Sequence, residues 1–271
     1  MNRKPGVKRH RQTSGADSEN VLSQFGAGLS RSSFETEEAT AGGPERQALR
    51  APGRIGELWR GLDGVWRDTN DHPINITQKN SSGTFFNLLE PDPKIIKTKD
   101  LALGLSRENR WNGQTIGEYG YSVAQHSVAM VQLLQLKLKS ENPTLLKYAL
   151  LHDAEEGLGI KDTITGLKIV LGETYLEIAN GISEAIHLRF SLRHPVPSEF
   201  KKPIKKADEI LGMTEAIHLM NFTPDQYRKR VRNHQLQPIE EEQFIEEYIF
   251  PWPPKRAQER FESEVNRLWG E

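Results

Sequence analysis

The sequence predicts a mainly α-helical protein with a short, partly β-structured segment ahead of the helices. From Thr98 onward, apolar residues recur at the three- and four-residue spacing of a helix face. Helix-start signals support this pattern, because Ser122 is followed three residues later by Gln125, and Asn142 directly precedes Pro143. Strand character is confined to the stretch before Thr98, where the apolar run TFFNLL follows the turn sequence NSSG. Together these observations predict an all-α fold class.

Composition and pattern divide the chain into four parts. Residues 1–52 are rich in Ser, Gly, Ala, Thr and Glu and have no apolar period, so we expect a disordered N-terminal tail. Its basic start could contact nucleic acid or an import receptor, but a solvated tail is the simpler interpretation. Residues 53–97 form a lead-in, and residues 98–220 form the helical core, with one helix of about 18 residues expected at 173–190. Residues 221–271 carry two or three charged amphipathic helices, which we interpret as a helical cover or an interaction surface.

The overall composition excludes several classes of protein. The formal net charge of −1 over 271 residues gives no general attraction to nucleic acid or to anionic membranes. No apolar run approaches the roughly 20 residues that a membrane-spanning helix needs, and no apolar segment follows the basic start as in a secretory signal. We therefore expect a cytoplasmic protein without a membrane partner. Because the sequence has no cysteine, any metal ion must be bound by His, Asp, Glu or water.

The stretch LLHDAEEGLGIKD, residues 150–162, places several metal-ligating side chains beside an apolar helix pattern. We expect the helix that starts at Pro143 to continue through His152 and Asp153, with Glu156 one turn further on the same side. A carboxylate on an apolar helix face is costly unless a cation pairs with it, and a neutral imidazole is the commonest partner ligand. The alternative is that His152 only caps the helix and Asp153 faces water.

Two further candidate ligands lie on other predicted helices. His126 flanks the apolar stripe of one helix, and Asp208 lies at the edge of the buried face of a helix expected over roughly residues 200–220. With His152 and Asp153 they form a set of two imidazoles and two carboxylates. Such a set suits one divalent ion of Mn, Co, Fe, Ni, Zn or Mg. The other histidines lack ligand neighbours in the sequence: His10, His72, His187, His194, His218 and His234.

Four blocks of the core resemble successive blocks of the HD-domain metal-dependent phosphohydrolases, in the branch that includes bacterial 5′-deoxynucleotidases and phage deoxynucleoside triphosphohydrolases. The resemblance covers roughly residues 84–220 and leaves out the tail and the C-terminal helices. It implies an HD-domain helical bundle for the core. The four blocks are DLALGLSRENRWNG (100–113), YSVAQHSV (121–128), ALLHDAEE (149–156) and KKADEILGMTEA (205–216).

The resemblance also implies roles for individual residues. Glu156 matches the acidic residue that handles the proton of the attacking water, and Arg110 matches an arginine that binds the substrate phosphate. Asp162 matches a second acidic catalytic residue, although the segment before it is one residue longer than usual. Alternatively, Arg110 and Trp111 form only a surface turn with an aromatic anchor. The family's metal ligands match His126, His152, Asp153 and Asp208.

The function that the resemblance implies is hydrolysis of a nucleotide, a nucleoside mono- or triphosphate, by attack of a metal-activated water on phosphorus. One alternative is hydrolysis of an alarmone or a cyclic nucleotide, which the absence of a GYP-containing extension makes the weaker interpretation. Another is a non-catalytic, metal-stabilised module that binds a nucleotide, and the presence of Glu156 and Arg110 argues against it. We therefore expect a small phosphorylated substrate, and a homo-oligomer is compatible with the sequence.

Overall fold

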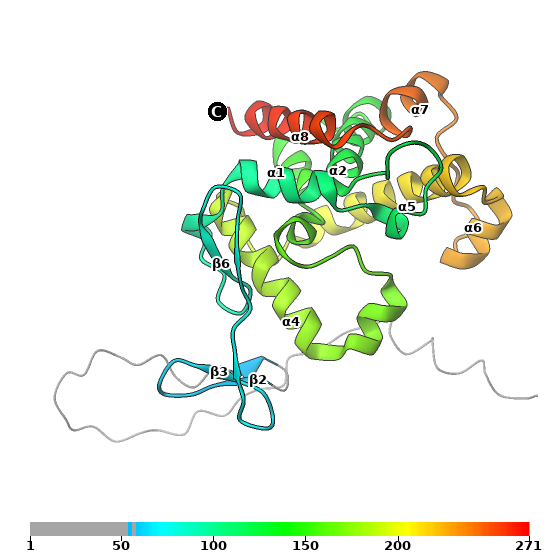
Figure 1. The fold of residues 1–271 in the computed structure, drawn as a ribbon. Coiled ribbons are helices and arrows are strands. Elements are labelled where there is room, and N and C mark those ends of the chain that lie inside the picture. Colours follow the sequence, from blue (N-terminus) through cyan, green and yellow to red (C-terminus); the bar gives the residue numbers. More distant parts are fainter. Residues whose placement is uncertain (1–53, 56–57, 271) are drawn as a thin grey trace, which may run out of the picture. The chain divides into compact units, whose positions relative to one another are not determined.

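The computed structural model describes residues 54–55 and 58–270, so the predicted disordered tail lies outside the described residues. Within them the chain is mainly helical, with small antiparallel sheets near the N-terminal end (Figure 1). The predicted all-α fold class with a short β lead-in is confirmed. Among the same residues, no helix combines the length and the apolarity that crossing a bilayer requires.

The lead-in forms two small antiparallel sheets. One is a meander in the order β1-β2-β3-β4, and the other is the hairpin β5-β6. The hairpin is attached to the first helix, because Ser81 and Ser82 donate hydrogen bonds of 2.5 to 2.9 Å to the buried carboxylate of Asp100. Phe86 strengthens this attachment by burying its whole side chain in the core. The strands are β1 (Arg54–Ile55), β2 (Leu58–Arg60), β3 (Trp66–Arg67), β4 (Pro73–Ile74), β5 (Thr77–Lys79) and β6 (Phe85–Asn87).

Five of the described helices pack around α2, whose residues from Val123 to Val131 are all buried. This burial arises because α2 contacts α1, α3, α5, α7 and α8. A helix surrounded on all sides has no solvated face, so its polar residues need partners inside the protein. His126 lies in the middle of α2 and is therefore fully enclosed. The helices are α1 (Thr98–Arg107), α2 (Val123–Gln132), α3 (Pro143–Leu150), α4 (Thr165–Arg189), α5 (Ser198–Met220), α6 (Pro224–Val231), α7 (Glu242–Tyr248) and α8 (Pro254–Trp269).

The C-terminal extension contributes a cover for the core. Figure 1 shows α8 lying alongside α1 and α2, and α8 also contacts α3. Ala257, Phe261 and Val265 follow one another at four-residue spacing on α8, and all three are buried. Of the two interpretations of the C-terminal helices, a helical cover is therefore the one that α8 fulfils.

The predicted helix starts are confirmed, and both depend on local hydrogen bonds. The hydroxyl of Ser122 accepts from the backbone N–H of Gln125 at 3.2 Å, and the side chain of Asn142 accepts from two backbone N–H groups at 3.0 and 3.2 Å. The side chain of Gln125 has a different task. It donates to the carbonyls of Tyr248 and Phe250, so it fastens α2 to the connection between α7 and α8.

The expectation that one helix continues through His152 and Asp153 is wrong. The helix α3 ends at Leu150, both residues lie in the turn that follows, and a 3₁₀ helix, η4 (Ala154–Leu158), comes next. The physical reason is the close approach of η4 to α1. A Cβ atom added to Gly104 of α1 would lie only 1.9 Å from the carbonyl oxygen of Gly157, so the chain must bend into this contact.

The helix expected at 173–190 is present but belongs to a longer, interrupted element. The helix α4 begins at Thr165 and is broken at Gly172, whose φ of 77° and ψ of −166° are not helical. From this glycine onward α4 follows the predicted course to Arg189. The extra helical turns between Thr165 and Gly172 carry Lys168, a residue that reaches the site described below.

Candidate metal centre

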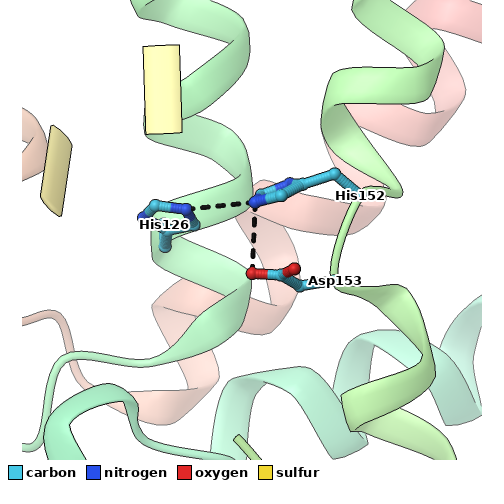
Figure 2. Close-up of side chains that lie close together, drawn as sticks. All are labelled: His126, His152 and Asp153. Atoms are coloured by element: carbon cyan, nitrogen blue, oxygen red, sulfur yellow. Dashed lines mark hydrogen bonds and ion pairs between the residues drawn. The ribbon is translucent and has the colours of Figure 1, made fainter. Parts of the chain in front are cut away.

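Three of the predicted ligands lie together and could hold a metal ion. His126 comes from the middle of α2, whereas His152 and Asp153 come from the turn after α3. Figure 2 shows the three side chains pointing toward one another, and one ligand atom from each lies within 4.8 Å of the other two. His152 Nε2 is 3.2 Å from His126 Nε2 and 3.1 Å from Asp153 Oδ2. These residues are the compact part of the predicted set.

The outer nitrogens of both imidazoles are bound to groups that only accept hydrogen bonds. His126 Nδ1 is 2.6 Å from a carboxylate oxygen of Glu215, and His152 Nδ1 is 2.9 Å from the backbone carbonyl of Ala149. Both Nδ1 atoms must therefore carry a hydrogen, and both Nε2 atoms turn inward. This is the arrangement in which histidines bind metals, with the second nitrogen oriented by a carboxylate or a carbonyl.

The inward-facing atoms need a positive charge between them. Burial lowers the pKa of His152, but the charge and the hydrogen bond of Asp153 outweigh burial and raise it to about 9. At neutral pH and without a metal ion, the extra proton on His152 therefore supplies the positive charge that these atoms need. A divalent ion fits the same atoms, because ligands bonded at about 2.1 Å to one ion lie about 3.0 to 3.4 Å apart. Nitrogen and oxygen ligands without thiolate suit the first-row divalent metals.

Asp208 touches this cluster without belonging to its compact part. Its Oδ1 atom is 3.2 Å from His126 Nε2, and its side chain is 41% exposed. Burial raises the pKa of Asp208, but its contact with His126 and the charge of Arg110 lower it overall. Asp208 is therefore an anion at neutral pH. The structure thus brings all four predicted ligands to one place, with Asp208 at the rim.

Arg110 lies over the same cluster and is only 14% exposed, so it is not part of a solvent-facing turn. Its Nε donates to Glu215 at 3.0 Å, and its terminal nitrogens lie 3.4 Å from Asp153 and 3.7 Å from Asp208. The next residues, Trp111 and Asn112, have left-handed φ values of 60° and 52°. Such a conformation is unusual for a Trp and costs free energy, which is typical of functional turns.

The predicted catalytic carboxylates lie outside the compact set. Glu156, in η4, is only 5% exposed, and its Oε2 has no hydrogen-bond partner among the described residues. Burial, followed by the charges of Asp153 and Asp162, raises its pKa to about 9, while Lys168, 3.5 Å away, opposes this. Burial raises the pKa of Asp162, against the charge of Arg110. Both groups can therefore carry a proton nearer neutral pH than an ordinary carboxyl.

Comparison with known proteins gives a relative but no activity. No protein-family model matches the chain. An uncharacterized protein of Rhodobacter capsulatus is 38% identical over 146 residues, which cover 54% of this chain and 74% of the relative. The chain belongs to the same family as that protein. Because the relative is itself uncharacterized, the chemistry has to be inferred from the site.

Two residues that the sequence reasoning missed complete the site. Glu215 binds Arg110, His126 and also the indole N–H of Trp111, at 2.9 Å. It lies seven residues after the predicted ligand Asp208, which is two helical turns, so its position on the same helix face could have indicated it. Lys168 had no such signal, because its contact depends on how the chain bends after η4.

A second pair of imidazoles lies elsewhere in the fold. His187 Nδ1 is 2.9 Å from His194 Nδ1, and His194 Nε2 is 3.1 Å from the side-chain oxygen of Asn180. Their sequence positions gave no hint of this contact. Burial lowers the pKa of both histidines, so the pair is neutral at physiological pH. Among the described residues, no third His or carboxylate joins them in a metal-binding group.

Proposed function

We propose that this protein is a metal-dependent phosphohydrolase of the HD-domain type that acts on a nucleotide. The observation that carries the proposal is the convergence of His126, His152 and Asp153 on one point, with the guanidinium of Arg110 beside it. These residues come from α2, from the turn after α3 and from the turn at Arg110, which lies 43 positions before Asp153. The four sequence blocks that resemble HD-domain phosphohydrolases point to the same residues.

The metal would be held by the two inward Nε2 atoms and by Asp153, with Asp208 within reach of the same point. A divalent ion in such a site supplies Lewis acidity, which makes water more acidic and offsets charge on a phosphoryl oxygen. Both Nδ1 atoms already carry the hydrogen that this task requires, because Glu215 and Ala149 accept from them, and a metal ion would displace the extra proton of His152. Little reorganisation would be needed for binding.

Arg110 would bind the substrate phosphate. Its Nε is occupied by Glu215, so the two terminal nitrogens are directed at the carboxylates of the metal set, at 3.4 and 3.7 Å. These distances are longer than strong charge-assisted hydrogen bonds, which measure about 2.7 to 2.9 Å. The terminal nitrogens can therefore exchange these partners for phosphoryl oxygens and stabilise the charge of the transition state.

Glu156 would move the proton of the attacking water. As the water oxygen bonds to phosphorus, the bond from phosphorus to the leaving oxygen breaks, and Glu156 takes the water proton and returns it to the leaving oxygen. Without a metal ion, burial and neighbouring anions raise the pKa of Glu156 to about 9, so it holds a proton. The charge of a bound divalent ion would favour the ionised form of Glu156, which can accept the water proton. Asp162, which raises the pKa of Glu156, is the next candidate for the same role.

The proposal is tested by assaying nucleotide hydrolysis with and without metal. Protein stripped with EDTA is reloaded with Mn²⁺ or Co²⁺ and incubated with a panel of nucleoside mono- and triphosphates, and the nucleoside product is separated by chromatography. We expect product only with metal, and none from Asp153→Ala, which should also lose the metal. Asp225→Ala, in an exposed ion pair on α6, is the matched control and should keep both. A protein that binds metal and nucleotide but releases no product would be a binding module instead.

A further inference from the structure

We propose that Glu215 is a positioning residue that couples the metal site to the phosphate site, because one carboxylate holds both His126 and Arg110. The inference rests on the proposed function of this site. It goes further by assigning a task to a residue that neither touches the substrate nor binds the metal. The two oxygens of Glu215 divide the task, with Oε1 on the imidazole and Oε2 on the guanidinium.

The geometry around Glu215 leaves its carboxylate no freedom. Oε1 accepts from His126 Nδ1 at 2.6 Å, and Oε2 accepts from Arg110 Nε at 3.0 Å and from Trp111 Nε1 at 2.9 Å. The side chain is 0% exposed, so no bulk water competes for these oxygens. A shift of this carboxylate would therefore turn the imidazole and the guanidinium at the same time.

The backbone that carries Glu215 is equally constrained. It lies in the buried stretch of α5 from Leu211 to Ala216, two turns beyond Asp208. A Cβ atom added to Gly212 would come within 2.6 Å of the hydroxyl of Tyr227, so α5 and α6 are in close contact there. The helix α5 therefore carries both the candidate ligand Asp208 and Glu215, whose carboxylate orients the candidate ligand His126. A helix is a more exact support for such a pair than a loop.

Charge gives Glu215 a second role, which is to keep Arg110 from competing for the metal ligands. Among the described residues, three carboxylates lie within 4 Å of Arg110, and its contact to Glu215 is shorter than those to Asp153 and Asp208. If the charge of Glu215 is removed, the nearest carboxylates that remain to the guanidinium among the described residues are the two of the metal set. It would then bind them more closely and oppose the entry of a cation.

The test measures Co²⁺ affinity by visible absorption in the wild type, Glu215→Gln and Glu264→Gln. Glu264 is also a buried glutamate, but it binds Gln132 and Arg267, which are outside the site, so it is the matched control. We expect Glu215→Gln to bind Co²⁺ 10- to 100-fold more weakly, as is typical when the partner of a metal-ligating histidine is lost. The control should bind like the wild type. Equal affinity of wild type and Glu215→Gln would overturn the inference.

A second measurement separates positioning from a general loss of structure. In metal-free protein, ¹⁵N NMR of the imidazoles reports whether His126 keeps its hydrogen on Nδ1. We expect one tautomer in the wild type and a mixture in Glu215→Gln, with no change at His187. If the Gln variant does not fold, Glu215→Asp replaces it, and an unchanged Co²⁺ affinity in that variant would equally refute the inference. Wild-type protein that binds no Co²⁺ would refute the metal site itself, which is a distinct result.

Discussion

Two buried glutamates beside the candidate site, Glu215 and Glu156, have opposite protonation behaviour. Glu215 is enclosed by three hydrogen-bond donors, and although burial raises its pKa, the charge of Arg110 and the hydrogen bonds from His126 and Trp111 hold it at about 2. Within the described part of the chain, Lys168 is the one cationic contact of Glu156, and burial together with Asp153 raises the pKa of Glu156 to about 9. Burial alone therefore does not decide the charge of a carboxyl in this protein.

The difference between the two glutamates lies in their partners. An anion that satisfies its oxygens with N–H donors remains an anion in a low-dielectric environment and can orient other groups. A carboxyl with an unpartnered oxygen and anionic neighbours is instead ready to hold a proton. We infer that Glu215 serves as a fixed charge and Glu156 as a proton carrier. The expected outcomes below test this division, from the largest effect to the smallest.

The largest effect should follow from Glu156→Gln, which keeps the size of the side chain but removes its ability to take a proton. With metal and nucleotide saturating, kcat should fall by roughly 10²- to 10⁴-fold, as is typical for the loss of a general acid–base group. Metal content, measured on the same sample, should be unchanged. A variant that loses its metal would show that Glu156 is a ligand or supports one.

The next effect is on the stability of the metal-free protein. Glu215→Gln and Glu156→Gln should change the free energy of unfolding in opposite directions. The ordinary pKa of Glu is 4.5, so the stabilisation by Glu215, with its pKa of about 2, is complete above pH 4.5 and is lost as the pH falls through 2. The raised pKa of Glu156 means that its protonated form stabilises the folded state. This stabilisation is complete below pH 4.5 and is lost as the pH rises through 9.

Urea unfolding at pH 8 should therefore show Glu215→Gln to be less stable than the wild type by about 3 kcal/mol, and Glu156→Gln to be more stable by about 1 to 3 kcal/mol. The gain for Glu156→Gln should shrink at pH 5, close to the ordinary pKa of 4.5, because the unfolded wild type then binds this proton almost as readily as the folded protein does. Two changes of the same sign at pH 8 would contradict the division into a fixed charge and a proton carrier.

A smaller effect is expected from Gly157→Ala, which acts on the position of Glu156 and leaves Glu215 untouched. The added Cβ would lie 2.7 Å from Leu105 Cγ and 3.0 Å from backbone atoms of α1, so η4 must move away. We expect a loss of about 1 to 3 kcal/mol in the free energy of unfolding, together with lower activity at unchanged metal content. Gly166→Ala is the control, because nothing lies within 4 Å of its added Cβ.

The smallest effect should come from Lys168→Gln. The lysine opposes the rise in the pKa of Glu156, so its loss should raise that pKa further and move the acidic limb of the pH–activity profile to higher pH. Stability should hardly change, because the side chain is partly exposed and screened by solvent. Lys161→Gln, in an exposed ion pair with Glu108, is the control. An unchanged profile would mean that Lys168 does not influence the proton carrier.

The sequence by itself determined most of the helices, the starting points of α2 and α3, and the kinds of residue available for metal binding. Ser122 and Asn142 cap their helices through hydrogen bonds that reach only two or three residues along the chain. Apolar periodicity likewise follows from the geometry of a single helix, which explains why the core helices and the C-terminal helices were predicted. The histidines and Asp153 were recognisable because charged side chains beside an apolar pattern need a partner.

Only the tertiary structure decided where the chain bends and which charge each carboxyl carries. The helix α3 stops at Leu150 because Gly157 must fit against Gly104, 53 residues away, and no local signal records that contact. The contact between Arg110 and Glu215 joins residues 105 positions apart. Desolvation and ion pairing act through space, so the same residue type becomes a fixed anion at 215 and a proton carrier at 156.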